Sequence, residues 1–236
     1  MNELIRATAE AGLGKTIYDV FFALGFVSVM TGLVIFGKKL GLTLKKTVCT
    51  VLIVYPIAVL WMFTMFWIAS GFSAWGGNNI VRVFVYVPLI GLFASKVLDI
   101  EKNKMMSLLS FGPLLVHGIS HFGCIFLGCC RGYPCSWGLY NPLFDDIRFP
   151  IQPIEALGAV AIVIYLLCRA KKRNYVPDGR EYPIMLTMYG SSRFLFEFFR
   201  HNEKLFWEIS NLALHALFML IVGIIWLMVI QKKRKG

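Results

Sequence analysis

Charged side chains are scarce in this sequence, at 16% of its 236 residues, whereas 58% of the residues are hydrophobic. The mean hydropathy of +0.68 lies far from the balance of a soluble globular domain. Acidic residues are the scarcer sign, 13 against 24 basic ones, which leaves a formal net charge of +11. The shortage of charge excludes an ordinary soluble domain and indicates that lipid surrounds most of the chain.

Several familiar signals are also missing. The segment 1–16 has a weak basic region and no cleavage-site pattern, so we expect the first helix to stay rather than to be removed as a signal peptide. No nucleotide-binding loop or other cofactor motif occurs, and we expect neither a cofactor nor a metal. No internal repeat or inverted duplication is found, which disfavours a transporter.

Long apolar stretches fill the rest of the sequence. A spanning helix needs roughly 20 mostly apolar residues, and about seven such stretches use up the chain. The sequence therefore predicts an all-α integral membrane protein, with a single polytopic domain over residues 1–236. The expected spans are 17–37, 47–70, 80–98, 105–129, 151–170, 181–200 and 206–230.

Basic residues sit at the edges of these spans, in every second connecting segment. By the positive-inside rule, these segments are cytoplasmic, the N-terminus is outside and the C-terminus is inside. Loops 71–79, 130–150 and 201–206 then face outward. Because the charge follows the membrane edges, we exclude nucleic acid as a partner. The basic residues are Lys38, Lys39, Lys45, Lys46, Lys96, Lys102, Lys104, Arg169, Lys171, Lys172, Arg173 and Lys232 to Lys235.

Ionisable residues inside spans are costly and are functional candidates by default. His117 and His121 are four residues apart and share a helical face. The sixth span carries a polar stripe of Tyr189, Arg193, Glu197 and Arg200 that climbs toward the outer leaflet. Two helices thus point at one place. The structural alternatives are that Arg193 and Glu197 neutralise each other, that Arg200 snorkels to the headgroups and that the histidines hydrogen-bond between helices.

Four cysteines lie close together near the outer surface: Cys124, Cys129, Cys130 and Cys135. Structural zinc sites usually show a C-x-x-C spacing, whereas the spacings here are five, one and five, which disfavours zinc. Cys129 or Cys130 could instead form a disulfide with Cys135 at an oxidising surface. A face of small residues used for helix packing is the third possibility.

The fourth span reads VHGISHFGCIFLGCCRG and is followed by FPIQPIEAL and then by YGSSRFLFEFFR. In this order the motifs resemble the prolipoprotein diacylglyceryl transferase family, in particular members whose fourth helix reads roughly GHAIGRIGCFLAGCCYG. The resemblance covers roughly residues 75–200. The matching residues are His117, Gly123, Cys124, Gly128, Cys129, Cys130 and Gly132, then Pro150, Gln152 and Glu155, and finally Tyr189, Gly190, Arg193, Phe194, Glu197, Phe198 and Arg200.

This resemblance implies transfer of a diacylglyceryl group from phosphatidylglycerol to the cysteine thiol of a prolipoprotein lipobox, at the outer leaflet of the bacterial plasma membrane. The partners would be phosphatidylglycerol, the prolipoprotein signal peptide and membrane lipids. Arg193 would grip the phosphate, Tyr189 would bind the glycerol or headgroup, and Glu197 would orient Arg193. Together with His121 these form the predicted catalytic set. The predicted substrate-binding set is Arg200, at the mouth of the site, with His117, Gln152, Glu155, Tyr86 and Cys124.

The sequence also departs from the family pattern. His121 stands where the family has arginine, and could act as a cation beside phosphate or as a base for the thiol. Tyr86 stands where the family has a histidine or tyrosine before two glycines, and both glycines are lost. These departures keep two alternatives open: a divergent paralogue that binds anionic lipid or a partner without catalysis, and a membrane thiol-redox protein built on the cysteines.

Overall fold

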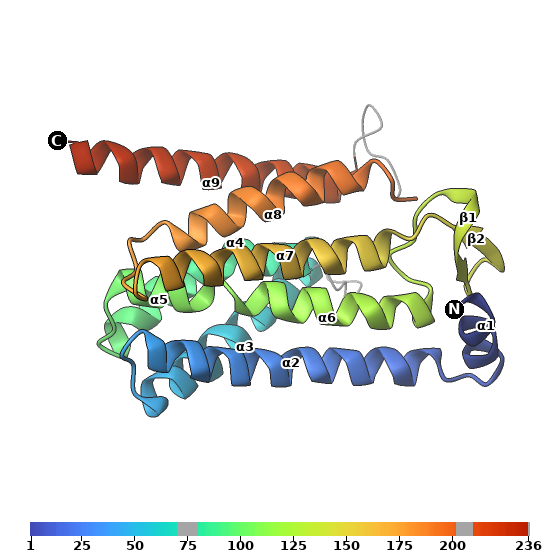
Figure 1. The fold of residues 1–236 in the computed structure, drawn as a ribbon, viewed down its shortest axis with the longest axis horizontal. Coiled ribbons are helices and arrows are strands. Elements are labelled where there is room, and N and C mark those ends of the chain that lie inside the picture. Colours follow the sequence, from blue (N-terminus) through green and yellow to red (C-terminus); the bar gives the residue numbers. More distant parts are fainter. Residues whose placement is uncertain (70–79, 202–209, 236) are drawn as a thin grey trace.

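The protein is described by a computed structural model that covers residues 1–69, 80–201 and 210–235 and is mostly helical (Figure 1). The elements, in chain order, are α1 Asn2–Glu10, α2 Gly14–Lys39, α3 Leu44–Ala69, α4 Ile80–Val97, α5 Lys102–Leu109, α6 Gly112–Leu127, β1 Pro134–Asn141, β2 Asp146–Arg148, α7 Ile151–Lys172, α8 Glu181–Glu197 and α9 Asn211–Lys235. The predicted outer loop 71–79 lies outside the described residues, as does loop 201–206 apart from His201.

Five stretches of the described chain are long and apolar enough to cross a membrane. They are α2, Leu44–Met65 of α3, Lys102–Leu127 across α5 and α6, α7, and Asn211–Arg234 of α9. The two other expected spans coincide with α4, whose apolar part is Val83–Val97, and with α8, which is helical but only 17 residues long. The prediction of apolar spanning helices is therefore supported, although the count of seven exceeds the five stretches that meet these criteria.

The outer segment 130–150, expected as a loop, contains a β-hairpin in this otherwise helical fold. Strands β1 and β2 pair there as an antiparallel hairpin, with Tyr140 opposite Ile147 and Asn141 opposite Asp146. The turn is held by Asn141, whose side-chain oxygen accepts from the Leu143 amide at 3.0 Å. β1 carries Pro, Ser, Gly and Asn, and β2 is only three residues long, so the sequence of this segment resembles a loop more than a pair of strands.

The two ends of the helix bundle differ in charge. The α2–α3, α4–α5 and α7–α8 connections and the C-terminus gather at one end, while the β-hairpin and α1 lie at the other (Figure 1). At the first end, Lys46 lies 3.7 Å from Asp99, and Arg234 lies 3.7 Å from Asp178. The basic segments expected in the cytoplasm therefore share one end of the molecule.

Close packing fixes the helix that carries the polar stripe. Gly190 of α8 lies against the backbone of α9, where an added Cβ would come within 2.7 Å of the Leu220 nitrogen. Only glycine permits this approach. Near its start, α8 is anchored to α4 by the buried Tyr182 hydroxyl, which donates to the Phe84 carbonyl at 2.7 Å. These contacts hold the stripe of α8 toward α6 and α7.

Candidate active site

A single carboxylate, that of Glu155 in the first turns of α7, lies at the centre of the buried polar cluster. Glu155 is only 3% exposed, and charged side chains from two other parts of the chain contact its carboxylate. Arg193 donates to Oε1 at 2.6 Å, and Arg200 Nε donates to the same oxygen at 3.0 Å. His121 Nε2 lies 2.9 Å from Oε2. Charge-assisted bonds in a buried setting are strong, so Glu155 organises the site.

The two histidines come from one face of α6, as their four-residue spacing predicts. Their ring centroids are 4.0 Å apart. Nδ1 of His121 lies 3.0 Å from the His117 carbonyl oxygen, and its Nε2 faces Glu155. The same Nε2 lies 3.2 Å from Nη2 of Arg200, so the ring stands between the Glu155 carboxylate and the Arg200 guanidinium, and a protonated ring would donate to the carboxylate. His117 Nε2 lies 2.9 Å from the Tyr189 hydroxyl, which links α6 to α8.

Of the predicted stripe, Tyr189, Arg193 and Glu197 share one buried face of α8, whereas Arg200 lies beyond the end of the helix. Arg193 lies 3.0 Å from Glu197, and Glu197 accepts in turn from the Ser210 hydroxyl at 2.6 Å. The Tyr189 ring stacks on Phe84 with centroids 4.4 Å apart. Arg193 is thus oriented by two carboxylates, and Glu155 is the nearer one. The expected role of Glu197 in orienting Arg193 agrees with this geometry.

Arg200 follows α8 and is placed by backbone contacts rather than by the helix. It forms an isolated bridge with Gly132, and the neighbouring His201 amide donates to the Arg131 carbonyl at 3.1 Å. The hairpin segment therefore fixes its backbone. Arg200 is only 2% exposed and pairs with Glu155, so the expectation that it lies at the mouth of the site is wrong. Buried pairing outcompetes snorkelling because Glu155 is within reach.

The charges of this network nearly cancel. The guanidiniums of Arg193 and Arg200 each form ion pairs with the carboxylates of Glu155 and Glu197. A charged His121 ring adds one positive charge to this balanced set. The cluster can therefore accept one further negative charge, such as a phosphodiester, without leaving an uncompensated buried anion.

A cavity of about 570 Å³ opens beside the network. Its polar wall is formed by His121, Ser120 and three cysteines, and its other walls are apolar side chains from α2, α3 and α4. These apolar residues include Phe22, Phe26, Val59, Phe63 and Val83. A chamber with one polar wall and several apolar ones suits an amphiphile whose charged part meets His121 and whose hydrocarbon part leaves along the helices.

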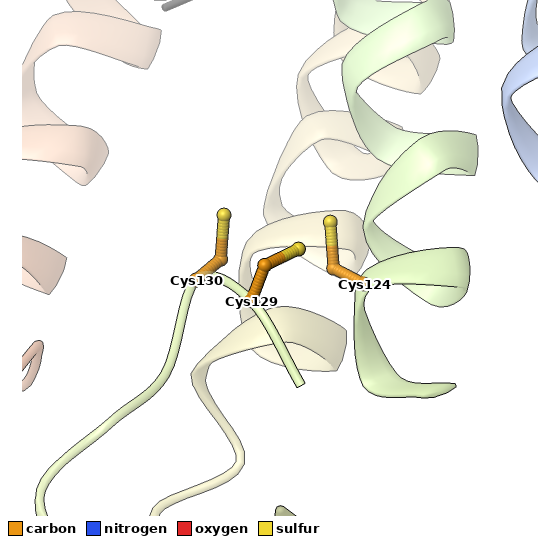
Figure 2. Close-up of side chains that lie close together, drawn as sticks. All are labelled: Cys124, Cys129 and Cys130. Atoms are coloured by element: carbon orange, nitrogen blue, oxygen red, sulfur yellow. The ribbon is translucent and has the colours of Figure 1, made fainter. Parts of the chain in front are cut away.

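The three cysteines of the polar wall converge (Figure 2). Cys124 comes from the last turns of α6, while Cys129 and Cys130 come from the loop that follows, and the three sulfur atoms lie within 4.8 Å of one another. Hydrogen bonds from Cys124 and Cys129, with the charge of Arg200, hold the pKa of the Cys130 thiol well below its usual range although burial opposes this.

Cys135 lies apart from this trio. Its thiol donates to the Trp137 carbonyl within β1, and all six cysteines are free in the structure. The disulfide from Cys129 or Cys130 to Cys135, weighed from the sequence, is thus not formed here.

Two predicted substrate-binding residues are placed differently from the rest. Tyr86 packs edge-on against Trp61 with centroids 6.0 Å apart, and Phe84, which the sequence did not single out, takes the place beside Tyr189. Residues two apart on a helix face nearly opposite sides, so only one of these rings can meet α8. Gln152 donates to the Cys129 carbonyl at 3.0 Å and therefore supports the cysteine loop.

Comparison with known proteins agrees with the motifs. A family model described as prolipoprotein diacylglyceryl transferase matches residues 4–229. The chain is also similar to a curated protein of Clostridium tetani named phosphatidylglycerol–prolipoprotein diacylglyceryl transferase, at 26% identity over 163 residues. That match covers 63% of this chain and 63% of the relative, so it spans less than two thirds of the relative's length.

Proposed function

Because the chain belongs to the prolipoprotein diacylglyceryl transferase family, we propose that it transfers a diacylglyceryl group from phosphatidylglycerol to the cysteine thiol of a prolipoprotein lipobox. The observation that carries this proposal is the buried network of Arg193, Arg200 and His121 around Glu155, beside a cavity with apolar walls. A phospholipid has the same division between an anionic head and apolar tails.

The chemistry asked of the site is displacement at a glycerol carbon. The acceptor sulfur bonds to that carbon while the carbon–oxygen bond to phosphate breaks, and glycerol phosphate leaves with the bonding pair. Arg193 is the residue we assign to the phosphate, because guanidinium donors fit two phosphate oxygens at once. Its bond to Glu155, at 2.6 Å, fixes its position before substrate arrives.

His121 is the second residue assigned to the developing charge. Its ring lines the cavity and also reaches Glu155 at 2.9 Å, so it lies between the charge network and the space for lipid. The Tyr189 hydroxyl is held by His117 and is placed to hydrogen-bond the glycerol or the headgroup once the pair opens. Glu197 and Glu155 orient the arginines rather than touch the lipid.

The distribution of charge supports an outward-facing site. The basic connections lie at the end of the bundle opposite the hairpin, while Arg200 is bridged to Gly132 at the hairpin end. Positive segments favour the cytoplasm. The site would then open toward the outer leaflet, with the N-terminus outside, the C-terminus inside and about seven crossings once α4 and α8 are counted.

A second candidate function is supported by the same network. The arginines are already paired with carboxylates, and His121 replaces a family arginine, so a chain that binds anionic lipid without turnover would show the same geometry. The two candidates differ in one outcome, namely whether a thioether product forms.

The test uses the full chain purified in detergent, phosphatidylglycerol and a synthetic lipobox peptide. We expect a diacylglyceryl mass increase on the peptide cysteine and release of glycerol phosphate, with no product from a peptide carrying serine instead. Arg193→Ala should abolish turnover, whereas the matched control Arg180→Ala, at the far end of the bundle, should leave it unchanged. Lipid binding without product, in an assay where a known family enzyme is active, would favour the second candidate.

A further inference from the structure

The cysteine trio is held in place by its own set of contacts. Gly128 ends α6 with φ +75°, and Cys130 adopts φ +55°, so two left-handed residues turn the chain back toward the helix. The Gly128 carbonyl accepts from Asn141 at 2.9 Å, and the Cys129 carbonyl accepts from Gln152 at 3.0 Å. A non-glycine residue with positive φ persists only where the surroundings enforce it. The loop is therefore shaped to bring the thiols together.

The arrangement of the sulfur atoms matches the needs of a thiophilic metal. Zinc binds cysteine sulfur at about 2.3 Å, which places the sulfurs of a tetrahedral site about 3.8 Å apart. The three sulfurs here lie within 4.8 Å of one another, so small side-chain rotations suffice. All three residues also line the cavity, so a ligand for the fourth position of a tetrahedron could come from the substrate space. Three protein ligands with an open fourth position are typical of catalytic zinc.

A second group of possible ligands, formed by His117, His121 and Glu155, lies nearby but does not suit a metal. Both oxygens of Glu155 are already engaged by the guanidiniums of Arg193 and Arg200. A divalent cation there would have to displace two fixed positive charges. A cation bound by the three cysteines would not have to displace these two guanidiniums from Glu155, and thiolates are softer ligands than a carboxylate.

We propose that Cys124, Cys129 and Cys130 bind one zinc ion whose fourth position takes the acceptor thiol and holds it as a thiolate for transfer. This proposal rests on the proposed function. The acceptor S–H loses its proton to water on binding, because a thiol bound to zinc is deprotonated. The sulfur then uses one electron pair to form the bond to the glycerol carbon, and the departing oxygen keeps the pair of the broken carbon–oxygen bond.

The neighbouring charges suit such a centre. Three protein thiolates and one substrate thiolate around a divalent ion give a net charge of two minus. The guanidinium of Arg200 and the ring of His121 both lie within hydrogen-bonding range of Cys130. The Arg200 guanidinium, which Glu155 also holds, therefore stands beside the centre, and the His121 ring also faces the cavity where the lipid phosphate would lie. Nucleophile and leaving group would be held by adjoining residues.

Metal content is the first measurement, and it needs no turnover. The full chain, purified in detergent without chelators, should carry about one zinc ion per chain by elemental analysis. Replacing any trio member by serine should remove most of the metal, whereas Cys49→Ser and Cys168→Ser, far from the trio, should retain it. Absence of zinc, copper in its place, equal zinc in the trio variants, or a disulfide within the trio by non-reducing mass spectrometry would each overturn the proposal.

Cobalt substitution tests the open position in the wild-type chain, so it does not depend on a variant that folds. Cobalt should give thiolate charge-transfer bands, and addition of the lipobox peptide should change them, while the peptide with serine should not. Cobalt bands that do not change when the cysteine peptide is added would overturn the thiol-binding role. If the peptide changes the spectrum but phosphatidylglycerol yields no product, the proposed lipid transfer fails while the metal centre and its thiol site stand.

Discussion

Arg200 donates to Glu155 from two nitrogens of its guanidinium, Nε at 3.0 Å to one oxygen and Nη2 to the other. This paired geometry joins the end of α8 to the start of α7, and Arg193 completes it from one side at 2.6 Å. A carboxylate buried between two guanidiniums is the counter-ion for both. The network is therefore a structural support as well as the floor of the candidate site.

Glu155→Gln should destabilise the protein strongly. The substitution keeps the shape of the side chain but leaves Arg193 and Arg200 buried without their shared counter-ion, which costs about 3 to 5 kcal/mol in comparable buried pairs. Thermal unfolding in detergent would measure the loss. The double variant Glu155→Gln with Arg200→Gln should recover part of it, because one unpaired charge is removed. Losses that simply add would argue against direct coupling of the two residues.

Arg193→Lys should lower turnover about 100-fold while the protein stays folded. Lysine keeps the charge near Glu155 and Glu197 but loses the planar fork that matches two phosphate oxygens. The rate constant at saturating phosphatidylglycerol is the quantity to measure, with unfolding temperature recorded in parallel. Arg180→Lys serves as the matched control in the α7–α8 connection. Undiminished turnover in Arg193→Lys would show that the Arg193 guanidinium does not bind two phosphate oxygens during the reaction.

Asp178, in the α7–α8 connection, predicts a dependence of stability on pH. Burial would raise the pKa of its carboxyl, but the hydrogen bond from the Arg180 amide and the bond and charge of Arg169 hold the pKa below its ordinary value of 3.8. Arg173 and Arg234 lie 3.5 and 3.7 Å away. A lowered pKa means that the carboxylate stabilises the fold above pH 3.8, and that this contribution is lost as the pH falls through the folded-state value.

Asp178→Asn should therefore cost about 1 to 2 kcal/mol at neutral pH, after allowance for the solvent exposure of its partners. The gap in unfolding midpoint between this variant and the wild type should close as the pH drops below 3.8. Asp99→Asn is the control, because that fully exposed carboxylate is 3.7 Å from a single lysine, Lys46. A gap that stays constant across the acid range would show that Asp178 is not ionised in the fold.

Much of the site could be anticipated from helical spacing. Four-residue intervals placed His117 with His121, and Tyr189 with Arg193 and Glu197, and the structure brings these two faces together. Spacing works here because α6 and α8 are regular helices whose polar residues have no other place to be buried. Glu155 was found only through the resemblance, since one carboxylate in an apolar helix carries no periodic signal.

The parts of the site that could not be predicted from the sequence are those whose positions depend on chain reversals. The cysteine spacing disfavoured a metal because it differs from the C-x-x-C spacing of structural zinc motifs. The left-handed residues Gly128 and Cys130 turn the chain so that Cys124, Cys129 and Cys130 nevertheless form a cluster. Arg200 was expected at the mouth of the site, and its burial could not be predicted because its bridge to Gly132 joins segments that are far apart in the chain. Such contacts depend on the β-hairpin, whose first strand is interrupted by turn residues and whose second strand is only three residues long.

The departure at His121 gives the last prediction. The ring pairs with Glu155 at 2.9 Å and lines the cavity, so a permanent cation should replace it. His121→Arg should keep turnover within about tenfold of wild type, while the neutral His121→Gln should lose about 100-fold or more. Phosphatidylglycerol titrations of both variants, with unfolding temperatures as a check on folding, separate binding from catalysis. Equal activity in the arginine and glutamine variants would mean that charge at this position is not what the site requires, and that His121 acts through its hydrogen bonds alone.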